Sequence, residues 1–141
     1  SLEVMVAEDC IPPLAQEKTD RERFWGLQDF KHIFPLRLDD WGRTHIFNSA
    51  ETCLIDLMSN IFRIGLDSIA VDARGRTEKY AREMTEAYLR AVDVTAAGLP
   101  KGDGPLKEDL QELKERIRPL ALGAITYGHF IKGLKDEIAK P

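Results

Sequence analysis

Between Leu106 and Ile138 the apolar residues recur in alternating steps of four and three, which places them along one face of a helix. This spacing is typical of the seam between helices that pack nearly antiparallel to one another. Pro119 lies inside the series, and because proline removes a helical hydrogen bond we expect a kink or a break there. The series therefore predicts a helical bundle.

Two stretches that resemble capping boxes begin at Thr19 and Asn48. In a capping box a side-chain oxygen and an acidic side chain three residues later bond each other's free N–H groups at the start of a helix. We therefore predict helices over residues 19–34 and 48–71, each with apolar side chains at helical spacing. Residues 35–47 show no helical period and are expected to form an irregular connection.

A third helix is predicted over residues 77–97, because Gly98 suits a left-handed cap and Pro100 follows it. No segment shows sustained alternation of apolar and polar residues. The predicted fold class is all-α, an up-and-down four-helix bundle behind an extended N-terminal segment. Residues 1–45 would be the lead-in and docking segment, including one short helix, and residues 46–141 the remaining helices of one domain.

Charge and hydropathy exclude several classes of partner. The 141 residues include 20 basic and 24 acidic side chains, which are well mixed and give a net charge of −4. Without a basic stripe or tail, nucleic acid is not an expected partner. No segment reaches the roughly 18–20 consecutive apolar residues that a membrane span requires, so the chain is expected to be soluble or peripheral to a membrane.

No residue pattern for catalysis or metal binding is evident. His32, His45 and His129 are scattered, without the Glu-x-x-His pairs of metal-binding bundles. No Ser–His–Asp set or nucleophile elbow is found. The expectation is a protein that is not an enzyme and that holds no metal and no cofactor.

Aromatic and arginine side chains concentrate between residues 23 and 43, and such side chains are common anchors of protein interfaces. The alternative is that the aromatics only cap the bundle. Arg63 lies on the polar stripe of the helix predicted over residues 48–71 and is assigned as a second contact. The predicted partner-binding residues are Phe24, Trp25, Phe30, Phe34, Arg37, Trp41, Arg43 and Arg63.

Two cysteines are too few for a disulfide scaffold and lack the spacing of a zinc or redox motif. Cys10 and Cys53 are either two unpaired thiols or one bridge that fixes the N-terminal segment to the bundle, which requires an oxidising compartment.

Two short motifs resemble the PsbQ family of extrinsic photosystem II subunits, which are four-helix bundles behind a proline-containing segment. An apolar residue, an arginine and a leucine three positions later are supplied by Phe62, Arg63 and Leu66. The stretch YLRAVDVTAA matches a leucine-rich run that leads to an acidic residue and then small residues, here Leu89, Asp93, Ala96 and Ala97. The resemblance covers roughly residues 50–118.

The resemblance implies a non-catalytic subunit that docks on the lumenal side of photosystem II and helps retain the calcium and chloride of the oxygen-evolving centre. Its partners would be the photosystem II core and the other extrinsic subunits, and its location the chloroplast thylakoid lumen, at the membrane periphery. A removed leader and a Cys10–Cys53 bridge would suit that compartment. The alternatives are a small helical adaptor or regulatory domain, or a subunit of another thylakoid complex.

Overall fold

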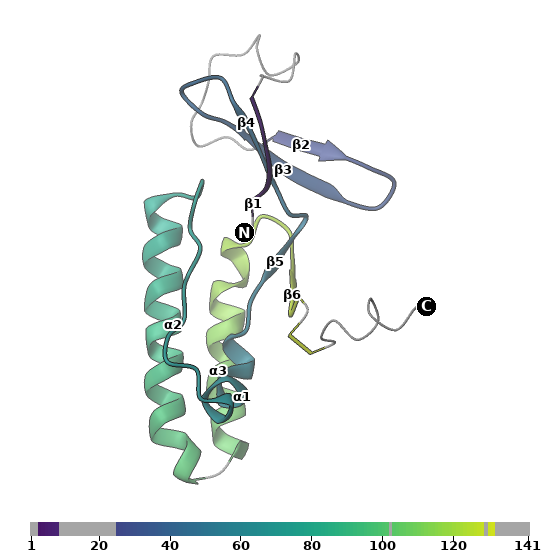
Figure 1. Cartoon of the computed structure of the whole chain (residues 1–141). Coiled ribbons are helices and arrows are strands. Elements are labelled where there is room, and N and C mark those ends of the chain that lie inside the picture. Colours follow the sequence, from purple (N-terminus) through teal and green to yellow (C-terminus); the bar gives the residue numbers. More distant parts are fainter. Residues whose placement is uncertain (1–2, 9–24, 102, 129, 132–141) are drawn as a thin grey trace, which may run out of the picture.

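The computed structural model describes residues 3–8, 25–101, 103–128 and 130–131 (Figure 1). Within these residues the chain forms two β-sheets and three α-helices, so the architecture is mixed α and β. The prediction of an all-α, up-and-down four-helix bundle is therefore wrong. No helix in the described ranges is both long enough and apolar enough to cross a membrane.

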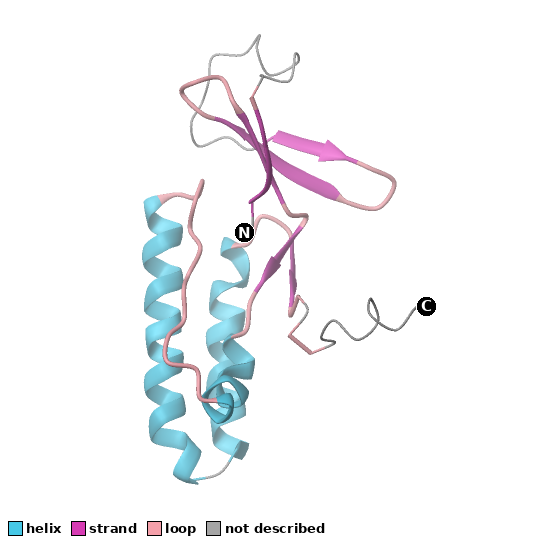
Figure 2. Cartoon of the chain, viewed as in Figure 1, coloured by secondary structure: helices cyan, strands magenta, loops and turns pink. Residues whose placement is uncertain are grey.

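The first sheet is antiparallel, with the strand order β1-β4-β3-β2, and the second is a parallel pair of strands. The strands are β1 (Glu3–Ala7), β2 (Trp25–Gln28), β3 (Ile33–Leu38), β4 (Thr44–Phe47), β5 (Ala50–Thr52) and β6 (Ala124–Thr126). The α-helices are α1 (Met58–Ile64), α2 (Glu78–Gly98) and α3 (Asp103–Ile117), and the 3-10 turns are η2 (Ile55–Leu57), η3 (Leu99–Lys101) and η4 (Arg118–Leu120). In Figure 2 the antiparallel sheet lies at one end of the molecule, beyond the ends of α2 and α3.

Two tight turns, each beginning with an aspartate, connect β2 to β3 and β3 to β4 in the antiparallel sheet. The Asp29 carboxylate accepts two backbone N–H groups, at 2.8 and 2.7 Å, and the Asp39 carboxylate accepts two more, both at 2.9 Å. Gly42 adopts the positive φ of 77° that the second turn requires. The predicted helix over residues 19–34 is therefore wrong in its described part, and residues 35–47 contain strands rather than an irregular connection.

Of the second and third predicted helices, the third is confirmed and the second is largely wrong. The prediction over residues 77–97 is confirmed by α2, whose Thr77 cap accepts the Tyr80 N–H at 3.2 Å. The helix predicted over residues 48–71 is largely wrong, because this segment begins with β5 and its α-helix ends at Ile64. Gly65 closes α1 with a φ of 78°.

The fourth predicted helix is confirmed only up to the predicted break. Helix α3 ends at Ile117, and Pro119 lies in the short turn η4. The chain then forms β6, which pairs with β5, where the apolar spacing had predicted a continuing helix.

The main core lies between the helices, where Met58, Ala91 and Leu110 are fully buried. The antiparallel sheet has a smaller core around Leu36 and Ile46. The predicted division into residues 1–45 and 46–141 stays a prediction.

The sheet meets the helical part at Gly75. A Cβ atom on Gly75 would lie 2.4 Å from Cζ of the fully buried Phe47, and the φ of Gly75 is 70°. Arg37 of β3 also donates to the Gly75 carbonyl at 2.5 Å. These contacts hold the β3–β4 hairpin against the segment that leads into α2.

Candidate functional site

A pocket of about 360 Å³ lies beside the β3–β4 hairpin, and charged side chains from three parts of the chain converge on it. We call it the hairpin pocket. Its lining residues are Glu3, Arg37, Leu38, Asp39, Asp40, Trp41, His45, Arg74 and Gly75. A hollow in which several titratable groups meet is a candidate binding site on physical grounds.

At the base of this pocket His45 lies between two carboxylates. Its Nε2 atom is 3.1 Å from Oδ2 of Asp39, and its Nδ1 atom is 3.1 Å from Oε2 of Glu3, because β1 pairs with β4. Arg43 adds a bond from Nε to Asp39 Oδ2 at 2.7 Å. Both imidazole nitrogens are therefore engaged by acceptors, which favours the protonated ring.

The pKa values of this cluster follow from its hydrogen bonds. Partial burial alone would lower the pKa of His45, but the bonds to Asp39 and Glu3 outweigh it and raise that pKa. Burial alone would raise the pKa of Asp39, but hydrogen bonds from His45 and Arg43 hold it well below its ordinary value of 3.8. The cluster thus supplies fixed charges, and His45 is poorly placed to accept a proton as a general base.

The rim of the pocket offers a flat aromatic surface. The Trp41 side chain is 78% exposed, and the guanidinium carbon of Arg43 lies 4.9 Å from the centroid of the Trp41 ring. Across the pocket, Arg74 bonds Asp72 through two nitrogens at 3.0 and 2.8 Å, and these bonds, more than any other influence, lower the pKa of Asp72 to about 2. A planar group with polar edges could stack on Trp41 and meet both charge signs there.

The structure brings together three of the predicted partner-binding residues at this pocket, namely Arg37, Trp41 and Arg43. It does not gather the others. Trp25 and Phe34 pack on the small core of the sheet, Phe30 is fully exposed in the β2–β3 turn, Arg63 lies on α1, and Phe24 is outside the described residues. Their role in binding a partner stays a prediction.

Sequence reasoning missed Glu3, Asp39, His45 and Arg74. The turn signal was present, since Asp39 precedes Gly42 by three residues in a pattern typical of a tight turn. The approach of Glu3 to His45 joins residues 42 positions apart and left no local signal.

A buried ion network joins β5 to the start of α2 and to the segment between α3 and β6. Arg76 and Glu51 pair through Nη1 and Oε1, and their side chains are only 5% and 6% exposed. Glu51 also accepts the Tyr80 hydroxyl at 2.9 Å and the Leu122 N–H at 2.9 Å, while Arg76 donates to the Leu120 carbonyl at 2.5 Å. These bonds join buried groups of the protein to one another, which indicates a structural role for this network.

A second buried cluster joins α3 to η2. Lys114 Nζ donates to Asp56 Oδ2 at 2.8 Å, and the Tyr127 hydroxyl donates to the same oxygen at 2.7 Å. Burial alone would lower the pKa of Lys114, but the hydrogen bonds to Asp56 and Tyr127 raise it. Lys114 is therefore held as a cation.

Cys53 is a free, buried thiol whose Sγ lies 3.9 Å from the Tyr88 hydroxyl. Burial raises its pKa, which is the opposite of what a reactive thiol requires. Cys53 is free in this structure and Cys10 lies outside the described residues, so a bridge formed in an oxidising compartment stays a prediction. Across the described part of the chain, no three His, Cys, Asp or Glu side chains are grouped to hold a metal ion.

Comparison with known proteins identifies the class. Residues 16–139 match the profile of Peptidase family U32, and the chain belongs to this family. It is also 30% identical over 119 residues to the "tRNA hydroxylation protein P2" of Bacillus subtilis (strain 168), a match that covers 84% of the chain. The chain spans 38% of that relative's length. No solved structure matches it.

These matches overturn the functional expectation drawn from Phe62, Arg63 and Leu66. The chain is not a PsbQ-like subunit, and the predicted photosystem II partners and role in oxygen evolution are wrong.

The expectation that nucleic acid is no partner conflicts with a relative named for tRNA hydroxylation. Membership of a family described as peptidases likewise conflicts with the expectation that the protein is not an enzyme. The thylakoid location rested on the same resemblance and loses that support.

Proposed function

We propose that this chain forms part of a protein that takes part in tRNA hydroxylation. The observation that carries the proposal is the 30% identity to the Bacillus subtilis protein, which extends over 84% of the chain. A match of this extent includes β2–β4, the helices and the segments between them, so it is not confined to one motif.

The hairpin pocket is the surface that we propose contacts RNA. Exposed aromatic rings are platforms on which nucleobases stack, and an arginine beside the ring adds a cation–π contribution. Trp41 with Arg43 has this arrangement, and Arg74 is a largely exposed cation across the same pocket. Because the net charge is −4, the contact would depend on these few groups rather than on a broad basic surface.

Peptide hydrolysis, which the family description raises, has less support in the described residues. The Cys53 thiol is buried and its pKa is raised, which opposes a nucleophilic role. His45 is bonded by a carboxylate on each ring nitrogen, which opposes a role as general base.

The test is a chimera in which this chain replaces the matched segment of the Bacillus subtilis protein. The chimera is expressed in a host whose tRNA lacks the hydroxylation, and digested tRNA is measured by mass spectrometry. We expect hydroxylated nucleoside in the chimera strain at a level comparable with the unaltered relative. A folded chimera that yields none would refute the proposal.

The contact surface is tested with two matched aromatic variants. Trp41→Ala removes the ring at the hairpin pocket, whereas Phe30→Ala removes an even more exposed ring from the other turn of the same sheet. Stacking contributes roughly 1–3 kcal/mol per base, so Trp41→Ala in the chimera should weaken tRNA binding by about 5- to 150-fold. Equal effects of the two variants would place the RNA contact elsewhere.

A further inference from the structure

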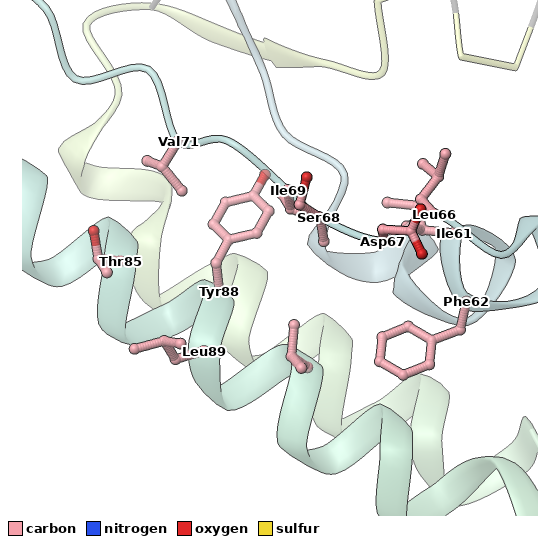
Figure 3. Close-up of a pocket in the computed structure, with 11 residues that line it drawn as sticks. Ile61, Phe62, Leu66, Asp67, Ser68, Ile69, Val71, Thr85, Tyr88 and Leu89 are labelled. Carbon is pink, nitrogen blue, oxygen red and sulfur yellow. The ribbon is translucent and has the colours of Figure 1, made fainter.

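Residues 66–71 lie along α2 at the surface of the helical part, without any backbone partner among the described residues. Gly65 ends α1, and the chain then runs from Leu66, on the side of Phe62, to Val71, on the side of Thr85, opposite in direction to α2 (Figure 3). Within the described part of the structure, no backbone N–H or carbonyl of residues 66–71 takes part in a hydrogen bond. Residues 66–70 are exposed, so their backbone groups are open to solvent and available to an added strand.

The second half of this segment contains two residues that favour a strand. Its residues are Leu66, Asp67, Ser68, Ile69, Ala70 and Val71, and β-branched side chains such as those of Ile69 and Val71 favour strands. The segment also exposes apolar surface to solvent. Ile64 is 62% exposed and Leu66 is 57% exposed, and Leu89 of α2 is exposed beside them.

Two hollows meet beneath this segment. One has a volume of about 270 Å³ and extends toward Phe62 and Leu89, and the other of about 240 Å³ extends toward Leu54 and Met84. Ile61, Ile69, Val71 and Tyr88 line both. Protein cores are close-packed, so adjoining hollows of this size along one segment indicate that a covering element is missing from this face.

We propose that residues 66–71 form an open strand edge that pairs with an extended strand supplied by the part of a U32-family protein that lies beyond this region. The related Bacillus subtilis protein is longer, since the chain spans 38% of it, and so contains polypeptide that could supply the strand. Added strands bind through backbone hydrogen bonds and place alternate side chains in pockets. The unpaired backbone provides the bonds, and the two hollows accept the side chains. This inference depends on family membership and not on the proposed tRNA hydroxylation.

Hydrogen–deuterium exchange followed by mass spectrometry tests the pairing. In the chain alone the amides of residues 66–71 should exchange at nearly the rate of an unstructured peptide. In the chimera with the rest of the Bacillus subtilis protein they should be slowed by at least about a hundredfold. The Phe30 amide, which lies in an exposed turn, should exchange rapidly in both. Equal exchange of residues 66–71 in the two proteins overturns the proposal.

A substitution separates backbone pairing from simple coverage. Ala70→Pro removes an N–H that is unpaired in the chain alone, whereas Ala70→Val keeps it and favours a strand. We expect the proline to abolish protection in the chimera and the valine to retain it. If the chimera does not fold, the aligned segment of the intact Bacillus subtilis protein is measured, and unprotected amides there overturn the proposal. A dimer of the chain alone that protects residues 66–71 would assign the edge to a second copy and would also overturn it.

Discussion

Replacing Glu51 by glutamine should strongly destabilise the fold, although the two side chains have nearly the same shape. Glutamine keeps an oxygen that can accept the Leu122 N–H, but it removes the negative charge beside Arg76. The Arg76 side chain is 5% exposed and cannot turn to solvent without leaving the core. The substitution therefore removes the Glu51 carboxylate from beside a buried cation.

The expected size follows from that burial. Removing one partner of a buried ion pair costs about 3–5 kcal/mol, and the retained hydrogen bonds place Glu51→Gln near the lower end, at about 3 kcal/mol. With a urea dependence of about 1.5 kcal/mol per molar, the unfolding midpoint should fall by about 2 M. A domain of this size has a total stability of about 5–15 kcal/mol, so the loss is a large share of it.

The assay is urea unfolding followed by circular dichroism, with Glu83→Gln as the matched control. Glu83 pairs with the exposed Lys79 at 3.8 Å, and breaking that pair should cost less than about 0.5 kcal/mol. The double variant Glu51→Gln/Arg76→Met should be less destabilised than the sum of its single variants, because it removes both charges.

Acid unfolding provides a second readout of the same carboxylate. Burial alone would raise the pKa of Glu51, but the bonds from Leu122 and Arg76 lower it below its ordinary value of 4.5. Its contribution to stability is therefore present above pH 4.5 and lost as pH falls through the lower folded pKa. Glu51→Gln should lack this loss. A Glu51→Gln protein as stable as the Glu83→Gln control would refute the role assigned to the network.

Three further outcomes are expected. The carboxylate partners of His45 raise its pKa, so its contribution to stability is full below about pH 6.5 and is lost as pH rises through the folded pKa. His45→Gln should therefore flatten the dependence of the urea midpoint on pH above about pH 6.5. An unchanged slope would contradict this role of His45. Gly75→Ala combines a φ of 70° with a clash against Phe47 and should lower stability by about 2–4 kcal/mol. Gly65→Ala should cost only about 1 kcal/mol, because its added methyl group meets open space. Equal losses in thermal unfolding would show that the clash at Gly75 is relieved. Cys53 should react with iodoacetamide only after unfolding, and rapid labelling of the native protein would contradict its burial.

Helices α2 and α3 could be predicted because their signals are local. The Thr77 cap and the helical spacing of apolar residues lie within the segment that they define. The left-handed cap expected at Gly98 is wrong, because Gly98 is the last helical residue and the chain continues through Leu99 with right-handed helical angles. Pro119 similarly marks the end of α3, since its missing N–H acts on its own helix.

The strands could not be predicted from spacing because they are short. Strands β2 and β4 have four residues each, and the spacing of Leu27, Phe30 and Phe34 fits a helix as well as a hairpin. What decides between them is the Asp29 carboxylate, which bonds the turn backbone. Strand β5 depends on partners far along the chain, so its own three residues carry little information.

In the candidate site, too, residues with a local sequence signal could be predicted and residues brought in by strand pairing could not. Arg37, Trp41 and Arg43 were recognisable as interface side chains, but Glu3 reaches His45 only because β1 pairs with β4. The misassigned family rested on Phe62, Arg63 and Leu66, a pattern that many amphipathic helices contain. The helix in fact ends at Ile64, so Leu66 is not on it.

The parallel pairing of β5 with β6 has a consequence for the order in which the chain folds. The bond from Leu122 to Glu51 joins residues 71 positions apart, and closing a flexible loop of that length costs about 4 kcal/mol of chain entropy. Helices α2 and α3, in contrast, pack on each other across a short connection. The helical pair should therefore assemble first and bring the two strands together, and slow refolding phases should report the docking of β6. The same strand pair should be the first to open as the native protein unfolds.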